Sequence, residues 1–194
     1  VFFGGADPDN LTGITLRALS KHSLKDLYVD VVIGENYPHG KEIRKIAEER
    51  GNTCVHVQID NIAEIMEKAD LAVGSGGVST WEKMALLLTG LTIATSENQK
   101  LIMEPLARKK GLLLIRDKNK VNIKTIQDYL LKLIDKPNYL TKQRNRLKNF
   151  INVYGVKLVI EWLVGNLVNV KWEARKATKK DMMLPEKIGA FMLL

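Results

Sequence analysis

Short apolar runs alternate with longer amphipathic segments over the first part of the chain. The runs are rich in Val, Ile and Leu and do not alternate with polar residues, which is typical of strands covered on both faces of a parallel sheet. We expect six strands, at Val1–Phe3, Leu27–Ile33, Thr53–Val57, Leu71–Val73, Leu91–Ala94 and Leu112–Ile115.

Helical patterns fill the segments between these runs. Asn10 can cap the first helix, and Gly51 and Gly111 are stop signals for two others. Strands and helices that alternate with short connections predict an α/β fold, namely a doubly wound, parallel six-stranded Rossmann-like sheet. The expected helices are Leu11–Lys21, Lys41–Arg50, Asn61–Lys68, Ser79–Leu88 and Glu97–Lys110.

The pattern after Asp117 is helical. Helices are expected at Val121–Ile134, Tyr139–Asn152 and Val156–Val168, and Pro137 is expected to break the chain between the first two. We expect residues 1–168 to form one domain, the sheet with its extra C-terminal helices. Residues 169–194 are expected to be a basic tail or the start of a second domain.

Composition changes this picture little. The chain is 45% hydrophobic and 27% charged, as is common for globular proteins, and it contains no apolar run long enough to cross a membrane. Its one cysteine, Cys54, excludes an internal disulfide and fits a reducing compartment, so we expect a cytoplasmic protein. Because the chain begins on a hydrophobic strand without an initiator Met, we expect it to be part of a longer protein.

The net charge of +8 leaves two interpretations open. The basic residues concentrate after residue 100 and either form a solvated surface or attract anions. Aromatic residues make up only 6% of the chain and are not interleaved with the basic ones. Since no DNA- or RNA-binding signature is present, a nucleic-acid partner is not expected.

The loops that follow strands carry the candidate chemistry, because ligands of open α/β sheets bind beyond the carboxyl ends of the strands. After the first strand, Gly4 and Gly5 allow close backbone approach, and Asp7 leads into a helix N-terminus that favours anions. The loop matches neither the dinucleotide fingerprint nor the Walker loop, so no cofactor is expected. A tight turn with an Asp or Asn cap is the alternative.

A glycine- and hydroxyl-rich segment follows the strand Leu71–Val73. Its main-chain amides and hydroxyls suit a diphosphate, and a carboxylate on the next helical turn could accept hydrogen bonds from ribose hydroxyls. The alternative is a capping box in which Ser79 and Glu82 satisfy the backbone of the helix start. The residues that carry this candidate site are Gly76, Gly77, Ser79, Thr80 and Glu82.

Two further loops add weaker signals. The amides of Asn98 and Gln99 offer both donors and acceptors, which suit sugar hydroxyls, although Ser96 and Gln99 also have the spacing of a capping box. The backbone at Ile59 could pair with a base edge, although Asn61 and the residues after it also read as a capped helix start. No metal site is expected.

Four segments together resemble one family: Gly4-Gly5-x-Asp7-Pro8-x-Asn10, Asn61-Ile62-Ala63-x-Ile65-Met66, Gly76-Gly77-x-Ser79-Thr80-Trp81-Glu82 and Glu97-Asn98-Gln99. They resemble the C-terminal half of the UDP-2,4-diacetamido-2,4,6-trideoxy-β-L-altropyranose hydrolases of pseudaminic acid biosynthesis. Those enzymes are similar in fold to the UDP-N-acetylglucosamine transferase of peptidoglycan synthesis, and both are two-domain, GT-B-like proteins with the nucleotide in the C-terminal half.

The resemblance implies a role for each site residue. Glu82 would bind the ribose, the backbone at Ile59 would meet uracil, and Asn98 and Gln99 would face the sugar. The diphosphate would contact Gly76, Gly77, Ser79 and Thr80. The segment Gly4, Gly5 and Asp7 would line the cleft opposite the missing N-terminal half.

The implied function is the nucleotide-sugar-binding domain of a UDP-sugar hydrolase that releases UDP. The histidine that activates water in that family belongs to the N-terminal half, and none of His22, His39 and His56 matches its motif, so the catalytic residues stay unknown. His56 sits in a strand and is expected to be packed. We expect the isolated chain to bind UDP or a UDP-sugar weakly and to hydrolyse nothing.

Other function classes stay open. The same half-fold serves as the donor-binding half of UDP-sugar glycosyltransferases, and a non-enzymatic module that binds anions or nucleic acid through its basic C-terminal part is a further possibility. The segment Lys171–Met182 resembles the opening of a GNAT-type acetyltransferase domain, and a plain basic tail is the alternative there.

Overall fold

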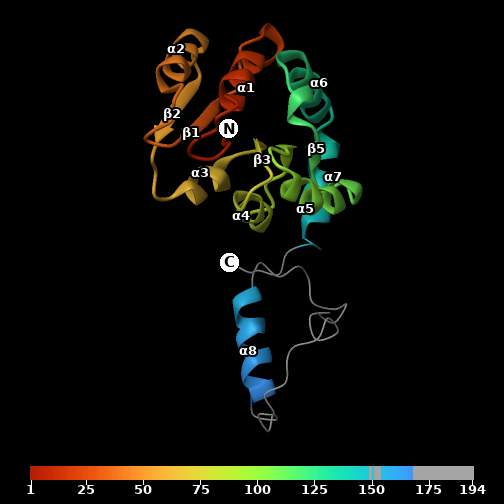
Figure 1. Cartoon of the computed structure of the whole chain (residues 1–194). Helices are drawn as coiled ribbons and strands as arrows, with labels where there is room; N and C mark the ends of the chain where they lie inside the picture. Colours follow the sequence, from red (N-terminus) through yellow and green to blue (C-terminus); the bar gives the residue numbers. More distant parts are fainter. Residues whose placement is uncertain (149, 151–153, 168–194) are drawn as a thin grey trace. The chain divides into compact units, whose positions relative to one another are not determined.

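The computed structural model describes residues 1–148, 150 and 154–167 (Figure 1). The chain divides into two compact units, Val1–Asn149 and Phe150–Leu194. The first unit is an α/β domain. In the second unit, the described structure centres on one helix, α8 (Gly155–Leu167). The sequence grouped this helix with the sheet, whereas the division into units falls before it.

The sheet of the first unit contains two groups of parallel strands. Strand β1 (Val29–Ile33) pairs with β2 (Thr53–Val57), and β3 (Ala72–Ser75) pairs with β4 (Gly90–Ile93), which pairs with β5 (Leu113–Ile115). Each strand is short and apolar, as the runs of Val, Ile and Leu predict.

The segment Val1–Phe3 joins the two groups. The amide of Val32 donates to the carbonyl of Val1 at 2.9 Å, and the amide of Phe2 donates to the carbonyl of Val73 at 3.0 Å. The order across the sheet is therefore β2, β1, Val1–Phe3, β3, β4, β5, and the N-terminus lies between β1 and β3 (Figure 1). This arrangement confirms the doubly wound parallel sheet. Among the described residues it has five strands, and where a sixth strand was expected, at Val1–Phe3, there is an isolated bridge from Phe2 to Gly74. The strand order reverses between Val1–Phe3 and β3.

Seven helices of the first unit surround this sheet, and 3-10 turns occur at His22–Leu24 and Lys118–Lys120. Helix α1 contacts both α2 and α6. Helix α6 turns Ile126, Leu130 and Leu133 inward, and all three are fully buried. The helices are α1 (Leu11–Leu19), α2 (Gly40–Arg50), α3 (Ile62–Lys68), α4 (Ser79–Ala85), α5 (Glu97–Arg108), α6 (Ile123–Ile134) and α7 (Pro137–Leu147).

Several helix boundaries differ from those expected. Pro137 is the first residue of α7 rather than a break before it, because the first helical position needs no N–H donor. Helix α4 ends early, at Ala85, and Leu87 beyond it adopts φ of 55°. Gly51 takes a positive φ of 66° after α2, as predicted, but Lys110 rather than Gly111 does so after α5.

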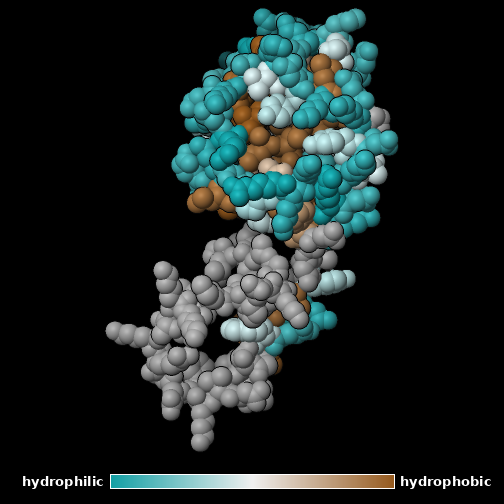
Figure 2. Space-filling model, turned by 90° about the vertical axis from the view of Figure 1, so that its right-hand side faces the viewer, coloured by the Kyte–Doolittle hydropathy of each residue, from teal (hydrophilic) through white to brown (hydrophobic). Residues whose placement is uncertain are grey.

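The edge strand β5 is only partly covered. Leu113 and Leu114 are half-buried and line a hollow with Tyr129. Figure 2 views the side of the first unit on which β5 and α6 lie, and shows an apolar patch surrounded by hydrophilic side chains. The charged pair Arg116 and Glu104 flanks this edge, and such charges discourage another strand from pairing with it.

No helix among the described residues is long and apolar enough to span a membrane. Residues 168–194 lie outside the described part of the chain. The segment Lys171–Met182, for which a basic tail and the start of an acetyltransferase domain were the two interpretations, is among them.

Candidate functional site

Loops at the carboxyl edge of the sheet meet where the strand order reverses. The loop after Val1–Phe3 lies next to the loop after β3, and β4 follows directly beyond it. This reversal point is where ligands of doubly wound sheets bind. Ile59 follows β2, which is three strands from β3, so its loop is about 14 Å away across the sheet.

The first loop approaches the loop after β1 closely. Gly4 has a φ of 91°, and a Cβ atom on Gly34 would lie 2.5 Å from the carbonyl oxygen of Gly5. Glycine is therefore favoured at position 4 by its positive φ and required at position 34 by the close approach of the two backbones. The sequence drew attention to Gly4 and Gly5, but Gly34 was missed because its partner lies far away in the chain.

Asp7 and Asn10 cap helix α1. The buried carboxylate of Asp7 accepts hydrogen bonds from the amides of Leu11 at 3.0 Å and Thr12 at 2.8 Å. The side-chain oxygen of Asn10 accepts from the amide of Gly13 at 3.1 Å. The first amides of α1 are thus already satisfied, so the expected anion site at this helix start is not available. Asp7 can line a cleft only through its backbone.

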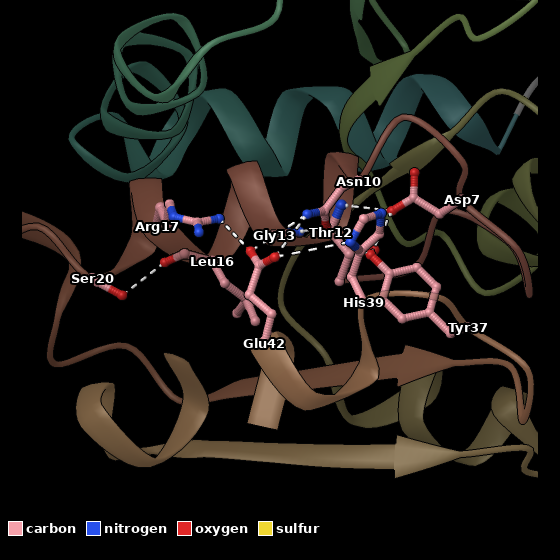
Figure 3. A network of polar contacts seen from close by, with 10 residues as sticks. All are labelled: Asp7, Asn10, Thr12, Gly13, Leu16, Arg17, Ser20, Tyr37, His39 and Glu42. Carbon is pink, nitrogen blue, oxygen red and sulfur yellow. Dashed lines mark hydrogen bonds and ion pairs between the residues drawn. The ribbon is translucent and has the colours of Figure 1, made fainter. Parts of the chain in front are cut away.

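A polar network extends from this cap to helix α2 (Figure 3). The hydroxyl of Tyr37 donates to the side-chain oxygen of Asn10 at 2.8 Å. The Glu42 carboxylate accepts from Arg17 of α1 and from the side-chain Nδ2 of Asn10, and His39 Nδ1 lies 3.9 Å from this carboxylate. The network fixes the loop after β1 against α1. Tyr37 and Glu42 were missed, since nothing local in the sequence marks them.

In this network the Tyr37 hydroxyl is neutral and the Glu42 carboxylate is ionised. Burial and the neighbouring Asp7 carboxylate raise the pKa of the Tyr37 hydroxyl, which therefore remains a donor. Desolvation acts to raise the pKa of Glu42, but the hydrogen bonds and charge of Arg17, with help from Asn10, outweigh it and hold that pKa below its usual range. Glu42 therefore stays ionised at neutral pH, and the network is a fixed support.

The glycine loop after β3 is held from two sides. The amide of Gly76 donates to the carbonyl of Ile93 at 3.1 Å and to Oε1 of Gln99 at 3.2 Å. The hydroxyl of Thr80 is buried and donates to the carbonyl of Ser75 at 3.3 Å. A Cβ atom on Gly76 would lie 2.7 Å from the side chain of Met103. Gly76 and Thr80 thus shape the loop, and their polar groups already have protein partners.

The capping box proposed for Ser79 and Glu82 is not formed. The residue before helix α4 is Val78, and no side chain caps the helix. The carboxylate of Glu82 is exposed and makes no hydrogen bond or ion pair within the described parts of the chain. The capping interpretation is therefore wrong, and the Glu82 carboxylate is available to an external donor.

The backbone amides at the start of α4 are also available. The amides of Gly77, Val78 and Ser79 donate to no acceptor among the described residues, whereas the next amide, that of Thr80, donates to the carbonyl of Gly77 at 3.0 Å. Successive free amides at a helix start form a concave arrangement that suits an anion. Free amides and a nearby carboxylate therefore occupy the same turn.

Gln99 ties the loop after β4 to the glycine loop. Its Oε1 accepts from the amide and hydroxyl of Thr95 at 3.0 and 3.1 Å, in addition to Gly76. The expected capping box with Ser96 is absent, because the hydroxyl of Ser96 bonds to the Asn98 side chain at 2.5 Å. Asn98 itself is exposed. Gln99 is thus foremost a positioning residue whose Nε2 lies beside Gly77.

The start of helix α3 differs from expectation in the same way. Asn61 precedes the helix but caps no amide, and its side chain bonds instead to Glu64 at 2.6 Å. Gln58 turns the chain with a φ of 48°, and Ile59 is half-buried beyond it. Within the described residues, no hydrogen bond joins Ile59 to another predicted site residue.

The three histidines lie apart from the glycine loop. His22 is exposed on the first 3-10 turn, and His39 belongs to the network around Glu42. His56 was expected to be packed in its strand. The structure shows it half-buried, with its Nε2 2.7 Å from Oδ1 of Asp30. Within the described residues, no histidine bonds to the glycine loop, residues 76–78 between β3 and α4.

Residues 1–155 match the model of the glycosyltransferase family 28 C-terminal domain. The chain is 28% identical over 103 residues to the uncharacterized protein MJ1062 of Methanocaldococcus jannaschii, covering 52% of this chain and 21% of that protein. It is 29% identical over 100 residues to the spore coat polysaccharide biosynthesis protein SpsG of Bacillus subtilis, covering 51% and 30%. The chain thus spans less than a third of these relatives.

Solved glycosyltransferases share the fold. WaaG, involved in lipopolysaccharide biosynthesis, superposes with a TM-score of 0.61 at 16% identity over 84% of this chain and 46% of its own. MurG of Acinetobacter baumannii superposes with a TM-score of 0.58 at 14% identity, over 84% of this chain and 49% of MurG. The spinosyn forosaminyltransferase SpnP superposes with a TM-score of 0.54 at 16% identity, over 84% of this chain and 43% of SpnP. At these identities the likeness shows the fold alone, that of one half of a GT-B-like protein.

Proposed function

Since the chain belongs to the family of glycosyltransferase family 28 C-terminal domains, we propose that it is the donor-binding half of a GT-B-like enzyme that takes a UDP-sugar in polysaccharide biosynthesis. The observation that carries the proposal is the turn at the start of α4. There, free amides of Gly77, Val78 and Ser79 lie one helical turn from the exposed carboxylate of Glu82.

Each part of this turn has a role in the proposal. The free amides bind the diphosphate, and the helix dipole adds to the attraction. The Glu82 carboxylate accepts hydrogen bonds from the ribose hydroxyls. Gln99 holds the loop in shape and, with Asn98, presents amide groups to the sugar. The backbone at Ile59 remains the proposed contact to uracil.

A transferase half is the first candidate, because the family is described as a glycosyltransferase family and the solved proteins of similar fold are glycosyltransferases. A UDP-sugar hydrolase of the pseudaminic acid type is the second candidate. It is favoured by the pairing of Trp81-Glu82 with Glu97-Asn98-Gln99 in one chain. The full-length protein distinguishes the two, since a hydrolase releases UDP from the donor with water alone and a transferase requires an acceptor.

The ribose contact is tested by calorimetric titration of UDP into the chain and its Glu82→Ala variant. We expect Glu82→Ala to weaken UDP binding at least ~10-fold, since a hydrogen bond to a charged group contributes about 1.5–3 kcal/mol. The free energy of unfolding should stay within about 0.5 kcal/mol of the unmodified chain, because Glu82 caps nothing.

The matched control is Glu48→Ala, which removes the same charge from an exposed position on α2. UDP affinity should be unchanged in this variant. Equal UDP affinity for the Glu82→Ala and Glu48→Ala variants would contradict the ribose contact.

A further inference from the structure

A cluster of metal-ligating side chains lies on strands β1 and β2, away from the glycine loop. Asp30, Cys54 and His56 each offer one ligand atom, and these atoms all lie within 4.8 Å of one another. All three residues are half-buried, and nothing in the proposed donor site uses them.

The sheet itself brings these side chains together. Asp30 lies directly opposite Cys54 in the parallel register, and Val32 lies opposite His56. Neighbouring strands are about 4.8 Å apart, and residues two apart on one strand project from the same face about 6.6 Å from each other. The spacing Cys-x-His on β2, with a carboxylate on β1, is therefore set by rigid backbone rather than by loops.

The geometry is close to that of a tetrahedral metal site. Ligand distances of about 2.0–2.3 Å around Zn²⁺ place neighbouring ligand atoms roughly 3.3–3.8 Å apart. The side chains within 4.8 Å therefore reach this spacing by adjusting their side-chain torsions. His56 Nε2 and Asp30 Oδ1, now 2.7 Å apart, would separate slightly as both turn toward an ion between them.

The chemistry of the donors selects the kind of ion. A thiolate and an imidazole favour zinc and similar first-row transition metals over magnesium and calcium, which prefer oxygen ligands. One thiolate and one carboxylate carry two negative charges, which balance a divalent cation, and the neutral imidazole completes the set. The same two negative charges would exceed the charge of a monovalent cation and would repel an anion.

The cluster is open to solvent on one side. The side chains of His56 and Asp30 are 26% and 32% exposed. Asp30 and Tyr28 also line a hollow of about 340 Å³ at the amino edge of the sheet. Water can therefore reach a fourth coordination position.

We propose that Asp30, Cys54 and His56 form a binding site for one divalent transition-metal ion, Zn²⁺ in the first place, with water as the fourth ligand. The site is separate from the proposed nucleotide site. It links β2 at the edge of the sheet to β1, so metal binding would stabilise this edge.

Cobalt titration of the chain tests this site, because Co²⁺ substitutes for Zn²⁺ and absorbs light. Cys54 is the only cysteine in the sequence, so a near-ultraviolet sulfur-to-cobalt charge-transfer band can come from no other residue. We expect this band to saturate at one Co²⁺ per chain and to disappear when one equivalent of Zn²⁺ is added.

Three variants make the test specific. Cys54→Ser should abolish the band, and His56→Gln should weaken Co²⁺ binding at least ~10-fold, as losing a ligand costs no less than losing its supporting contacts. His22→Gln, which removes an exposed histidine elsewhere, should bind Co²⁺ like the unmodified chain. Circular dichroism and UDP titration establish that each variant is folded.

The proposal is overturned if the unmodified chain shows no charge-transfer band, or if Cys54→Ser and His22→Gln bind Co²⁺ with equal affinity. In that case the contact between His56 and Asp30 is a hydrogen bond across two strands and nothing more. The donor-site proposal is unaffected by either result, because UDP binding is measured separately.

Discussion

Lys83 of helix α4 carries a charge where burial opposes one. It is only 7% exposed, and burial lowers its pKa from 10.5 to about 8, while the nearby Glu82 acts in the opposite direction. Between pH 8 and 10.5 the unfolded chain therefore binds a proton that the folded chain has released. The free energy of unfolding should rise with pH through this window, and below it the buried charge costs on the order of 3 kcal/mol.

Replacing the amine should remove this cost. We expect Lys83→Met to raise the free energy of unfolding at pH 7 by about 1–3 kcal/mol and to abolish the Lys83 contribution to the rise from pH 8 to 10, as measured by urea denaturation. Lys41→Met, at an exposed position on α2, is the control and should leave both quantities unchanged. A lower free energy of unfolding for Lys83→Met than for the unmodified chain at pH 7 would show that a partner compensates the buried Lys83 charge.

At the scale of single residues, the sequence does not predict which contacts each side chain of the candidate site makes. Ser79 and Glu82 have the same spacing whether they cap a helix or bind a ligand, so sequence alone could not separate the two. Only the backbone of α4 settles that Val78, not Ser79, precedes the helix. Thr80 was expected to face a diphosphate, yet its hydroxyl is buried against Ser75.

Between elements, Gln99 is the link that holds the glycine loop to helix α5. A single oxygen atom accepts from the amides of Gly76 and Thr95, at 3.2 and 3.0 Å. We expect Gln99→Leu to lower the free energy of unfolding by about 1–3 kcal/mol in urea denaturation, because these amides lose their acceptor, and to weaken UDP binding as the loop loosens.

Gln99→Glu is the matched variant, since its carboxylate keeps the acceptor oxygens. It should retain most of the stability of the unmodified chain. If Gln99→Glu and Gln99→Leu are destabilised equally, the link between the loop and α5 does not depend on the acceptor.

Helix and strand identities follow from the sequence, but their ends often do not. Each expected helical pattern within the described residues corresponds to an observed helix, and every expected strand run except Val1–Phe3 to an observed strand, because apolar periodicity reports burial directly. At Val1–Phe3 there is only an isolated bridge. Pro137 fits either a break or a helix start, because proline lacks the backbone N–H that a helix interior needs and the first helical position does not. Leu87 and Lys110 adopt positive φ although a glycine lies nearby, so glycine positions alone do not predict where these helices end.

At the scale of the whole domain, the order of the strands places the loops of the candidate site. Alternation of strands and helices predicts a doubly wound sheet, and the reversal between Val1–Phe3 and β3 then brings the glycine loops together. Contacts such as that between Gly5 and Gly34 could not be foreseen, because they join loops that are distant in sequence. The chain covers under half of each solved glycosyltransferase that it superposes on.

The most direct test of the account is the selectivity of the chain for UDP over ADP, measured by isothermal titration calorimetry in one buffer at one salt concentration. A donor site for UDP-sugars should bind UDP at least ~10-fold more tightly than ADP, a difference of about 1.4 kcal/mol. Equal affinities for the two nucleotides, falling together as salt is added, would contradict a UDP site and leave only attraction of anions to a basic surface.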